Sequence, residues 1–175
     1  MSARPSALAF QLAGSGHAMG AFLDRVGRDG CDELRRGLRT DDRAIVPGYT
    51  LLLVALCALS VVWVRAATSG TPEAVATVLG VLFGLLAVAA GVLDLLENRA
   101  LRRVLDDWQP IPIPVAPDEA EAAERQQRRR SQVAAIDGPS RAAKRRAVWK
   151  WRLIALVLGW VLVSGVVGLT SWLSN

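Results

Sequence analysis

Histidine and cysteine are almost missing from this chain of 175 residues, which contains one histidine and two cysteines. A histidine-based metal site needs several imidazole ligands, and the cysteines lack metal-ligand spacing, so the sequence predicts neither a bound metal nor a cofactor. Cys31 lies in a polar segment and Cys57 in an apolar one. Because we expect these segments to lie at different depths, we predict that the two thiols form no disulfide.

Lysine is also scarce, with 2 lysines against 19 arginines, a bias typical of a GC-rich bacterial genome. The formal net charge is +5, which by itself would suit a nucleic-acid partner. The cations, however, flank apolar segments. We therefore predict a lipid bilayer with anionic head groups as the partner, and no nucleic acid.

Charge is nearly absent from three blocks, residues 45–64, 74–96 and 153–173. A helix of about 20 residues spans the ~30 Å hydrocarbon layer of a bilayer, and buried core helices of this length would need a much larger soluble protein around them. The sequence predicts an all-α integral membrane protein, a small bundle of three transmembrane helices plus an N-terminal amphipathic helix. Residues 1–20 lack the apolar core of a signal peptide, so we expect the first span to act as its own uncleaved insertion signal.

Four regions follow from these blocks: residues 1–44 as a cytoplasmic amphipathic segment, 45–98 as a transmembrane hairpin, 99–149 as a Pro/Arg-rich cytoplasmic loop, and 150–175 as the third transmembrane helix. Apolar residues of the first region fall on one face of a broken helix. That face could lie in the lipid interface or pack on the cytoplasmic ends of the bundle. In the loop, alternating prolines favour an extended start, followed by a short solvated helix and a mobile middle.

Lysine and arginine outside the spans predict the orientation. Residues 1–44 carry seven, the first connector carries only Arg65, and residues 99–150 carry twelve. The positive-inside rule then predicts a multi-pass protein of the bacterial plasma (inner) membrane, with a cytoplasmic N-terminus and the C-terminus outside.

Acidic residues end the second span in the stretch "DLLEN", which contains Asp94, Glu97 and Asn98 on adjoining helix positions. Acids are disfavoured at the negative end of a helix, and ionised groups at a membrane boundary need partners. Lys150 is the expected countercharge. We predict that a polar junction joins the cytoplasmic ends of the three spans, formed by Asp42, Tyr49, Asp94, Glu97, Asn98 and Lys150.

Small residues recur at helical spacing in the second span, where Gly80 and Gly84 form a GxxxG motif and Gly91 extends the stripe. Such stripes let helices approach closely, within one chain or between copies. We expect an intramolecular use here, while a homo-oligomer or a membrane-protein partner stays open.

The chain resembles a loosely defined set of uncharacterised small bacterial multi-pass membrane proteins. The resemblance is carried by "FQLAGS" at residues 10–15, by Asp42, Pro47 and Tyr49, by the D-L-x-E-N motif that ends the second span, and by Lys150 before the third. Arg43 departs from the pattern, and the basic loop is longer than the pattern implies. The resemblance implies the architecture and these residues, and no activity.

Three functions are compatible with the pattern. The first is a non-enzymatic scaffold or accessory subunit in which the junction is structural. The second is a small carrier component that moves protons, cations or a solute with Asp94, Glu97 and Lys150. The third is a membrane-embedded enzyme with paired carboxylates, which would need more polar groups within the spans than this chain has. We predict the first, and no enzyme.

Overall fold

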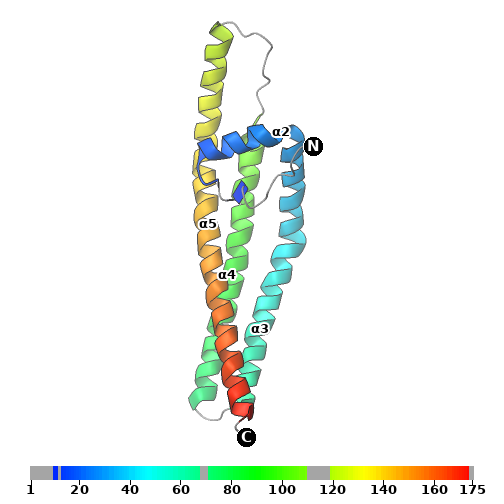
Figure 1. Ribbon diagram of the computed structural model, residues 1–175, viewed down its shortest axis with the longest axis vertical. Helices are drawn as coiled ribbons and strands as arrows, with labels where there is room; N and C mark the ends of the chain where they lie inside the picture. Colours follow the sequence, from blue (N-terminus) through cyan, green and yellow to red (C-terminus); the bar gives the residue numbers. More distant parts are fainter. Residues whose placement is uncertain (1–9, 12, 68–70, 110–118, 174–175) are drawn as a thin grey trace. The chain divides into compact units, whose positions relative to one another are not determined.

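The structure, a computed structural model, is all-α, as predicted, and describes residues 10–11, 13–67, 71–109 and 119–173. Its elements are α2 (Gly16–Thr40), the π-helix η1 (Asp41–Ile45), α3 (Val46–Ala67), α4 (Thr71–Asp107) and α5 (Glu119–Leu173) (Figure 1). Three helical stretches are long and apolar enough to cross a membrane: Gly16–Ala67, Glu73–Asp107 and Glu119–Thr170. The first two contain the uncharged blocks 45–64 and 74–96, and the third contains most of the block 153–173.

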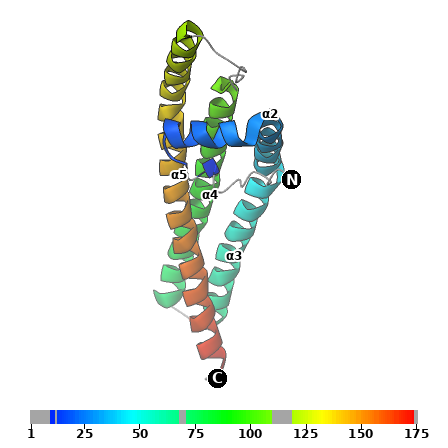
Figure 2. The ribbon, with the colours of Figure 1, turned by 45° about the horizontal axis from the view of Figure 1, so that its top comes forward.

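Two compact units share these helices. Unit 1 comprises Met1–Asp42 and Leu96–Ala147, and unit 2 comprises Arg43–Leu95 and Val148–Asn175. Both α4 and α5 therefore contribute to each unit. Within unit 2, α3, α4 and α5 run lengthwise beside one another, as both views of the ribbon show (Figures 1 and 2).

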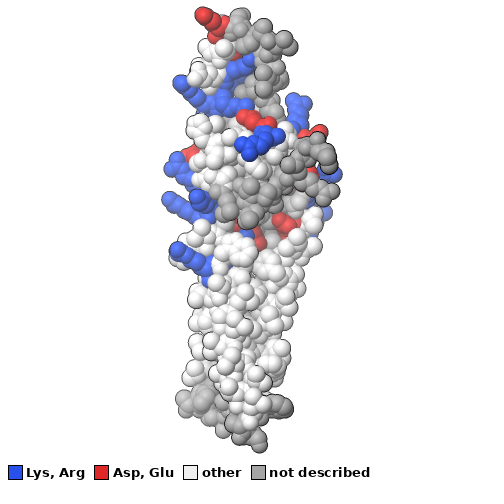
Figure 3. Space-filling view, in the orientation of Figure 1, with Lys and Arg blue, Asp and Glu red and all other residues white. Residues whose placement is uncertain are grey.

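Unit 2 has a thin core and an apolar exterior. Leu53 and Cys57 of α3, Ala87 of α4 and Val157 of α5 are buried together. Outside this core, large apolar side chains point away from the protein, with Leu51 and Leu162 each 70% exposed. The face of unit 2 visible in Figure 3 is nearly free of charge, whereas charged side chains gather on the visible face of unit 1. An apolar surface of this extent is unfavourable in water and suits contact with lipid or another protein.

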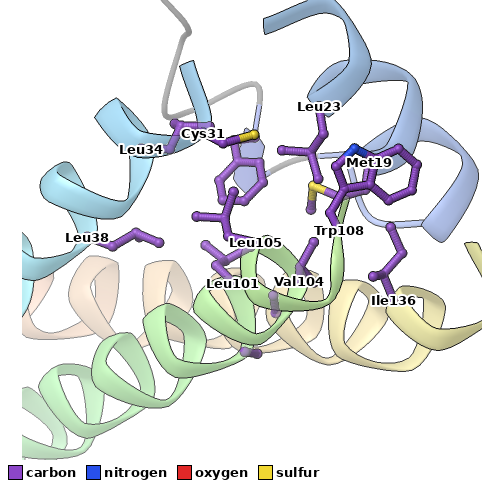
Figure 4. Packing of buried hydrophobic residues seen from close by; sticks show 13 residues of the cluster. Met19, Leu23, Cys31, Leu34, Leu38, Leu101, Val104, Leu105, Trp108 and Ile136 are labelled. Atoms are coloured by element: carbon purple, nitrogen blue, oxygen red, sulfur yellow. The ribbon is translucent and has the colours of Figure 1, made fainter. Parts of the chain in front are cut away.

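Unit 1 encloses a larger apolar core, in which α2 packs against the last turns of α4 and the first half of α5 (Figure 4). Met19 and Leu23 of α2, Leu101 and Leu105 of α4, and Ile136 of α5 are all completely buried. The apolar side chains that α2 contributes to this core contact protein, which supports packing rather than lipid contact for this part of residues 1–44.

One glycine bends α2. Gly27 has φ 67° and ψ −169°, a conformation outside the helical region that is almost restricted to glycine. Helical residues precede and follow it, so α2 consists of two helical pieces that change direction at this position. The broken helix expected in the N-terminal segment thus has its break at Gly27.

The segment 99–149 differs from the predicted loop, because α4 continues to Asp107 and α5 begins at Glu119 and runs for 55 residues. The prediction of a short helix with a mobile middle is wrong over these residues. Glu121–Arg125, Glu124–Arg128 and Asp137–Arg141 form ion pairs at i, i+4 spacing along α5, and such pairs favour helix over coil. Pro139 lies inside α5 although it donates no backbone hydrogen bond. The extended segment expected at the alternating prolines lies outside the described residues.

Candidate functional site

The carboxylate of Asp94 is the centre of a polar cluster in unit 2. Its Oδ1 accepts a hydrogen bond of 2.8 Å from the Lys150 ammonium on α5, and its Oδ2 accepts one of 2.7 Å from the Tyr49 hydroxyl on α3. The two charged side chains are nearly removed from solvent, with 5% of Lys150 and 12% of Asp94 exposed. One carboxylate on α4 thus connects all three helices of the unit.

Tyr49 and Lys150 reach Asp94 from the two helices that lie beside α4. Tyr49 lies in the first turn of α3, where its long ring lets the hydroxyl reach the neighbouring helix. Lys150 and Arg152 are the last two cations before a long uncharged run in α5, and the Lys150 ammonium lies 5.6 Å from the centre of the Trp151 ring. Buried ammonium and carboxylate groups are costly alone, so their pairing offsets much of the desolvation penalty of each.

A second polar cluster belongs to unit 1. Asp42 in η1 accepts a hydrogen bond of 2.9 Å from the side-chain amide of Asn98 and forms an ion pair with Arg102. In the same unit, Arg146 of α5 donates a hydrogen bond of 2.8 Å to the backbone carbonyl of Leu96. Sequence reasoning missed Arg146, and it named Arg102 only as one of three arginines that could offset the acids at the end of the second span. The place of Arg102 in the cluster could have been predicted, because this residue lies four residues after Asn98 on the same face of α4.

The six predicted junction residues therefore divide equally between the units. Tyr49, Asp94 and Lys150 are in contact within unit 2, and Asp42 and Asn98 are in contact within unit 1. Glu97 also belongs to unit 1 and is fully buried on α4. The structure thus shows contacts among three of the predicted residues within unit 2 and between two of them within unit 1, and a single junction of all six stays a prediction.

Two of the three predicted packing glycines permit a close approach of α3 and α4. A Cβ atom on Gly91 would lie 2.4 Å from Oγ1 of Thr50, and one on Gly80 would lie 2.0 Å from Cγ2 of Val61. Both distances are shorter than van der Waals contact. A Cβ atom on Gly84 would meet no atom within 4 Å, so this residue has no packing role within the described part of the chain.

Other hydroxyl groups of unit 2 do not extend the Asp94 cluster. Ser60 donates to the carbonyl of Cys57 and accepts from Trp160, and Thr77 donates to the carbonyl of Glu73. Within the part of the chain that the structure describes, these hydroxyls make their bonds without Asp94. These two hydroxyls therefore do not connect Asp94 to the rest of unit 2.

Comparison with protein-family models, with curated proteins and with solved structures finds no match to this chain. The resemblance based on the D-L-x-E-N motif stays a prediction, and function has to be inferred from the residues themselves.

Proposed function

We propose that this chain is an integral protein of a bacterial inner membrane that crosses the bilayer three times and acts as a non-enzymatic scaffold or accessory subunit. In this proposal Tyr49, Asp94 and Lys150 form a structural junction that fixes the register of the three spans. The observation that carries the proposal is that both oxygens of the buried Asp94 carboxylate accept hydrogen bonds from different helices.

Membrane insertion is supported by the exterior of unit 2. Its three helices expose large apolar side chains, among them Leu52, Val78 and Val163, each at least 58% exposed. In water such a surface would drive aggregation, whereas a bilayer stabilises it. The positive-inside rule adds the orientation, since both strongly basic regions flank the same ends of the apolar blocks.

A structural role is supported by the contacts of the acid itself. A group that carries protons or cations has to bind and release them, and release requires that competing partners be weak or mobile. Asp94 is instead held by a buried ammonium and by a phenolic hydroxyl at short distances. Partners fixed in this way favour a stable joint over a transport step.

Flux measurements in reconstituted vesicles test the choice between scaffold and carrier. Vesicles with the wild-type protein and an internal pH-sensitive dye should acidify at the rate of protein-free vesicles when a pH gradient is applied. Faster acidification that is lost in Asp94→Asn but kept in Glu73→Gln, an acid of the exposed pair with Arg65, would contradict the scaffold and establish the carrier.

Cysteine labelling tests the orientation. Cys31 and Cys57 are both buried, so the wild-type protein provides a background of low reactivity. Ser69→Cys, in the first connector, should react with an impermeant maleimide added outside intact cells, and Ser131→Cys on α5 should react only after the membrane is permeabilised. The reverse pattern would overturn the topology.

A further inference from the structure

The start of α2 rests on one face of α5 within unit 1. The backbone N–H of Gly16 donates a hydrogen bond of 2.9 Å to Oδ1 of Asp137. A Cβ on Gly16 would lie 2.4 Å from the carbonyl oxygen of Val133, so only glycine lets the two helices meet this closely. Beside this contact lies an open hollow of about 700 Å³.

Arginines border this hollow on both sides of the α2 contact. Arg129 and Arg130 precede Val133 by one turn of α5, and Arg141 follows Asp137 by one turn, while Ser15 and His17 of the α2 start complete the polar lining. Two of these arginines are held in place. Arg129 donates to Asp24 at 2.9 Å and lies 4.5 Å above the Trp108 ring, and Arg141 is paired with Asp137.

The charge balance of the lining favours an anion. Three guanidinium groups face one carboxylate, and the acids of Asp24 and Asp137 are already engaged by Arg129 and Arg141. The hydrogen bonds from the Gly16 backbone and the Arg141 side chain lower the pKa of Asp137. Arg130 is exposed and forms no ion pair within the described part of the chain.

We propose that this hollow binds a phosphate group, free or carried by a lipid or other small molecule, between Arg129 and Arg130 on one side and His17 and Arg141 on the other. A guanidinium group presents two parallel N–H donors that match two phosphate oxygens, which an ammonium does not. Because ion pairs already hold the side chains of Arg129 and Arg141, less conformational entropy is lost when a ligand binds. The uncharged side chains of Val133 and Ala134 between the arginines leave room for the rest of a ligand. The site lies in unit 1 and does not depend on the scaffold function.

Calorimetric titration of the detergent-solubilised full-length protein tests the proposal. The probes are inorganic pyrophosphate, as a soluble phosphate, and the short-chain lipid dihexanoyl phosphatidic acid. We expect at least one probe to bind in a saturable manner, and the tighter probe identifies the source of the phosphate. Arg130→Gln should weaken that binding about tenfold, the usual loss when a charge-assisted hydrogen bond is removed.

Arg145→Gln is the matched control, because it removes the same charge from an exposed position of α5 that does not line the hollow. Its affinity should stay within about twofold of wild type, as expected for screened charges at a distance. Both variants alter exposed side chains. The unfolding temperature of each variant is measured alongside, so that a loss of binding is distinguished from a loss of folding. Failure of both probes to bind, or equal weakening by Arg130→Gln and Arg145→Gln, would overturn the site.

Discussion

Replacing Lys150 by methionine removes the charge that faces the Asp94 carboxylate and keeps most of the side-chain volume. Asp94 is then left with the Tyr49 hydroxyl as the partner of Oδ2, at a position where only 12% of its side chain is exposed. Breaking a buried ion pair from one side typically costs about 3–5 kcal/mol, because the remaining charge is uncompensated. Asp94→Asn removes the negative charge that faces the Lys150 ammonium, whose side chain is 5% exposed.

The double variant Asp94→Asn/Lys150→Met should recover most of this loss. It removes both charges together and leaves an amide at position 94 that can still accept from Tyr49. Replacing both members of a buried pair is often nearly neutral, so we expect the double variant to lie within about 1–2 kcal/mol of wild type. The coupling free energy from the double-mutant cycle should then exceed the average of about 0.6 kcal/mol measured for polar contacts between membrane helices.

Reversible unfolding in mixed micelles gives the free energies for this cycle, and the abundance of each variant in membranes gives an independent comparison. The matched control is the Arg65–Glu73 pair of the same unit, which is 2.7 Å long and has 54% and 35% of its side chains exposed. Exposed pairs contribute about 0–1 kcal/mol. Equal coupling in the two cycles would refute the idea that burial makes the Asp94 pair a structural joint.

Three further perturbations follow from the structure. Gly91→Ala should destabilise the protein by about 1–3 kcal/mol in the same unfolding assay, because its Cβ would lie 2.4 Å from Thr50 Oγ1, and Thr50→Ala should partly restore the stability. Gly84→Ala, where no atom lies within 4 Å of the new Cβ, should be neutral or slightly stabilising. The opposite ranking of the two variants would contradict the close α3–α4 contact. Gly27→Ala should cost about 1–3 kcal/mol from backbone strain alone, because φ is 67° and no atom would contact the new methyl group, whereas Gly37→Ala in the helical part of α2 should cause no loss of stability. Asp137→Asn should destabilise unit 1 at neutral pH. The Gly16 and Arg141 hydrogen bonds lower the pKa of Asp137 from 3.8, so the wild-type carboxylate stabilises the fold above that value and loses this contribution as pH falls through the lowered pKa. The difference in stability between variant and wild type should therefore shrink in acid unfolding curves, and an unchanged difference would show that the carboxylate is not the cause.

The helix positions and the Asp94–Lys150 ion pair could be predicted from the sequence, because each follows from a short-range rule. An uncharged block of about 20 residues dictates a long apolar helix, and an isolated acid near the end of such a block requires a cation at a similar position on a neighbouring helix. Asp94 and Lys150 satisfied both conditions. Their contact is present in the structure, and its functional role stays a prediction.

Other features depend on information that local patterns do not carry. Gly138 and Pro139 both disfavour a helix interior, yet α5 continues through both. Ile136 and Ala143 on either side of them are buried in the core of unit 1, and this tertiary packing outweighs the local preference of Gly and Pro. The assignment of Asp94 and Asn98 to different compact units had no sequence signal either, because the two residues are one helical turn apart on α4.

The partners of Asp94 and of Asp42 bear on how the protein could work. Asp94 has both carboxylate oxygens engaged within unit 2, and Asp42 has an amide and a guanidinium group as partners within unit 1. Each acid is therefore neutralised by donors of its own unit. A carrier that moved a proton or cation would have to free at least one carboxylate from such partners in every cycle, at a cost of about 3–5 kcal/mol for a buried pair. A scaffold needs no such step, because the same contacts that would obstruct release hold the helices in register.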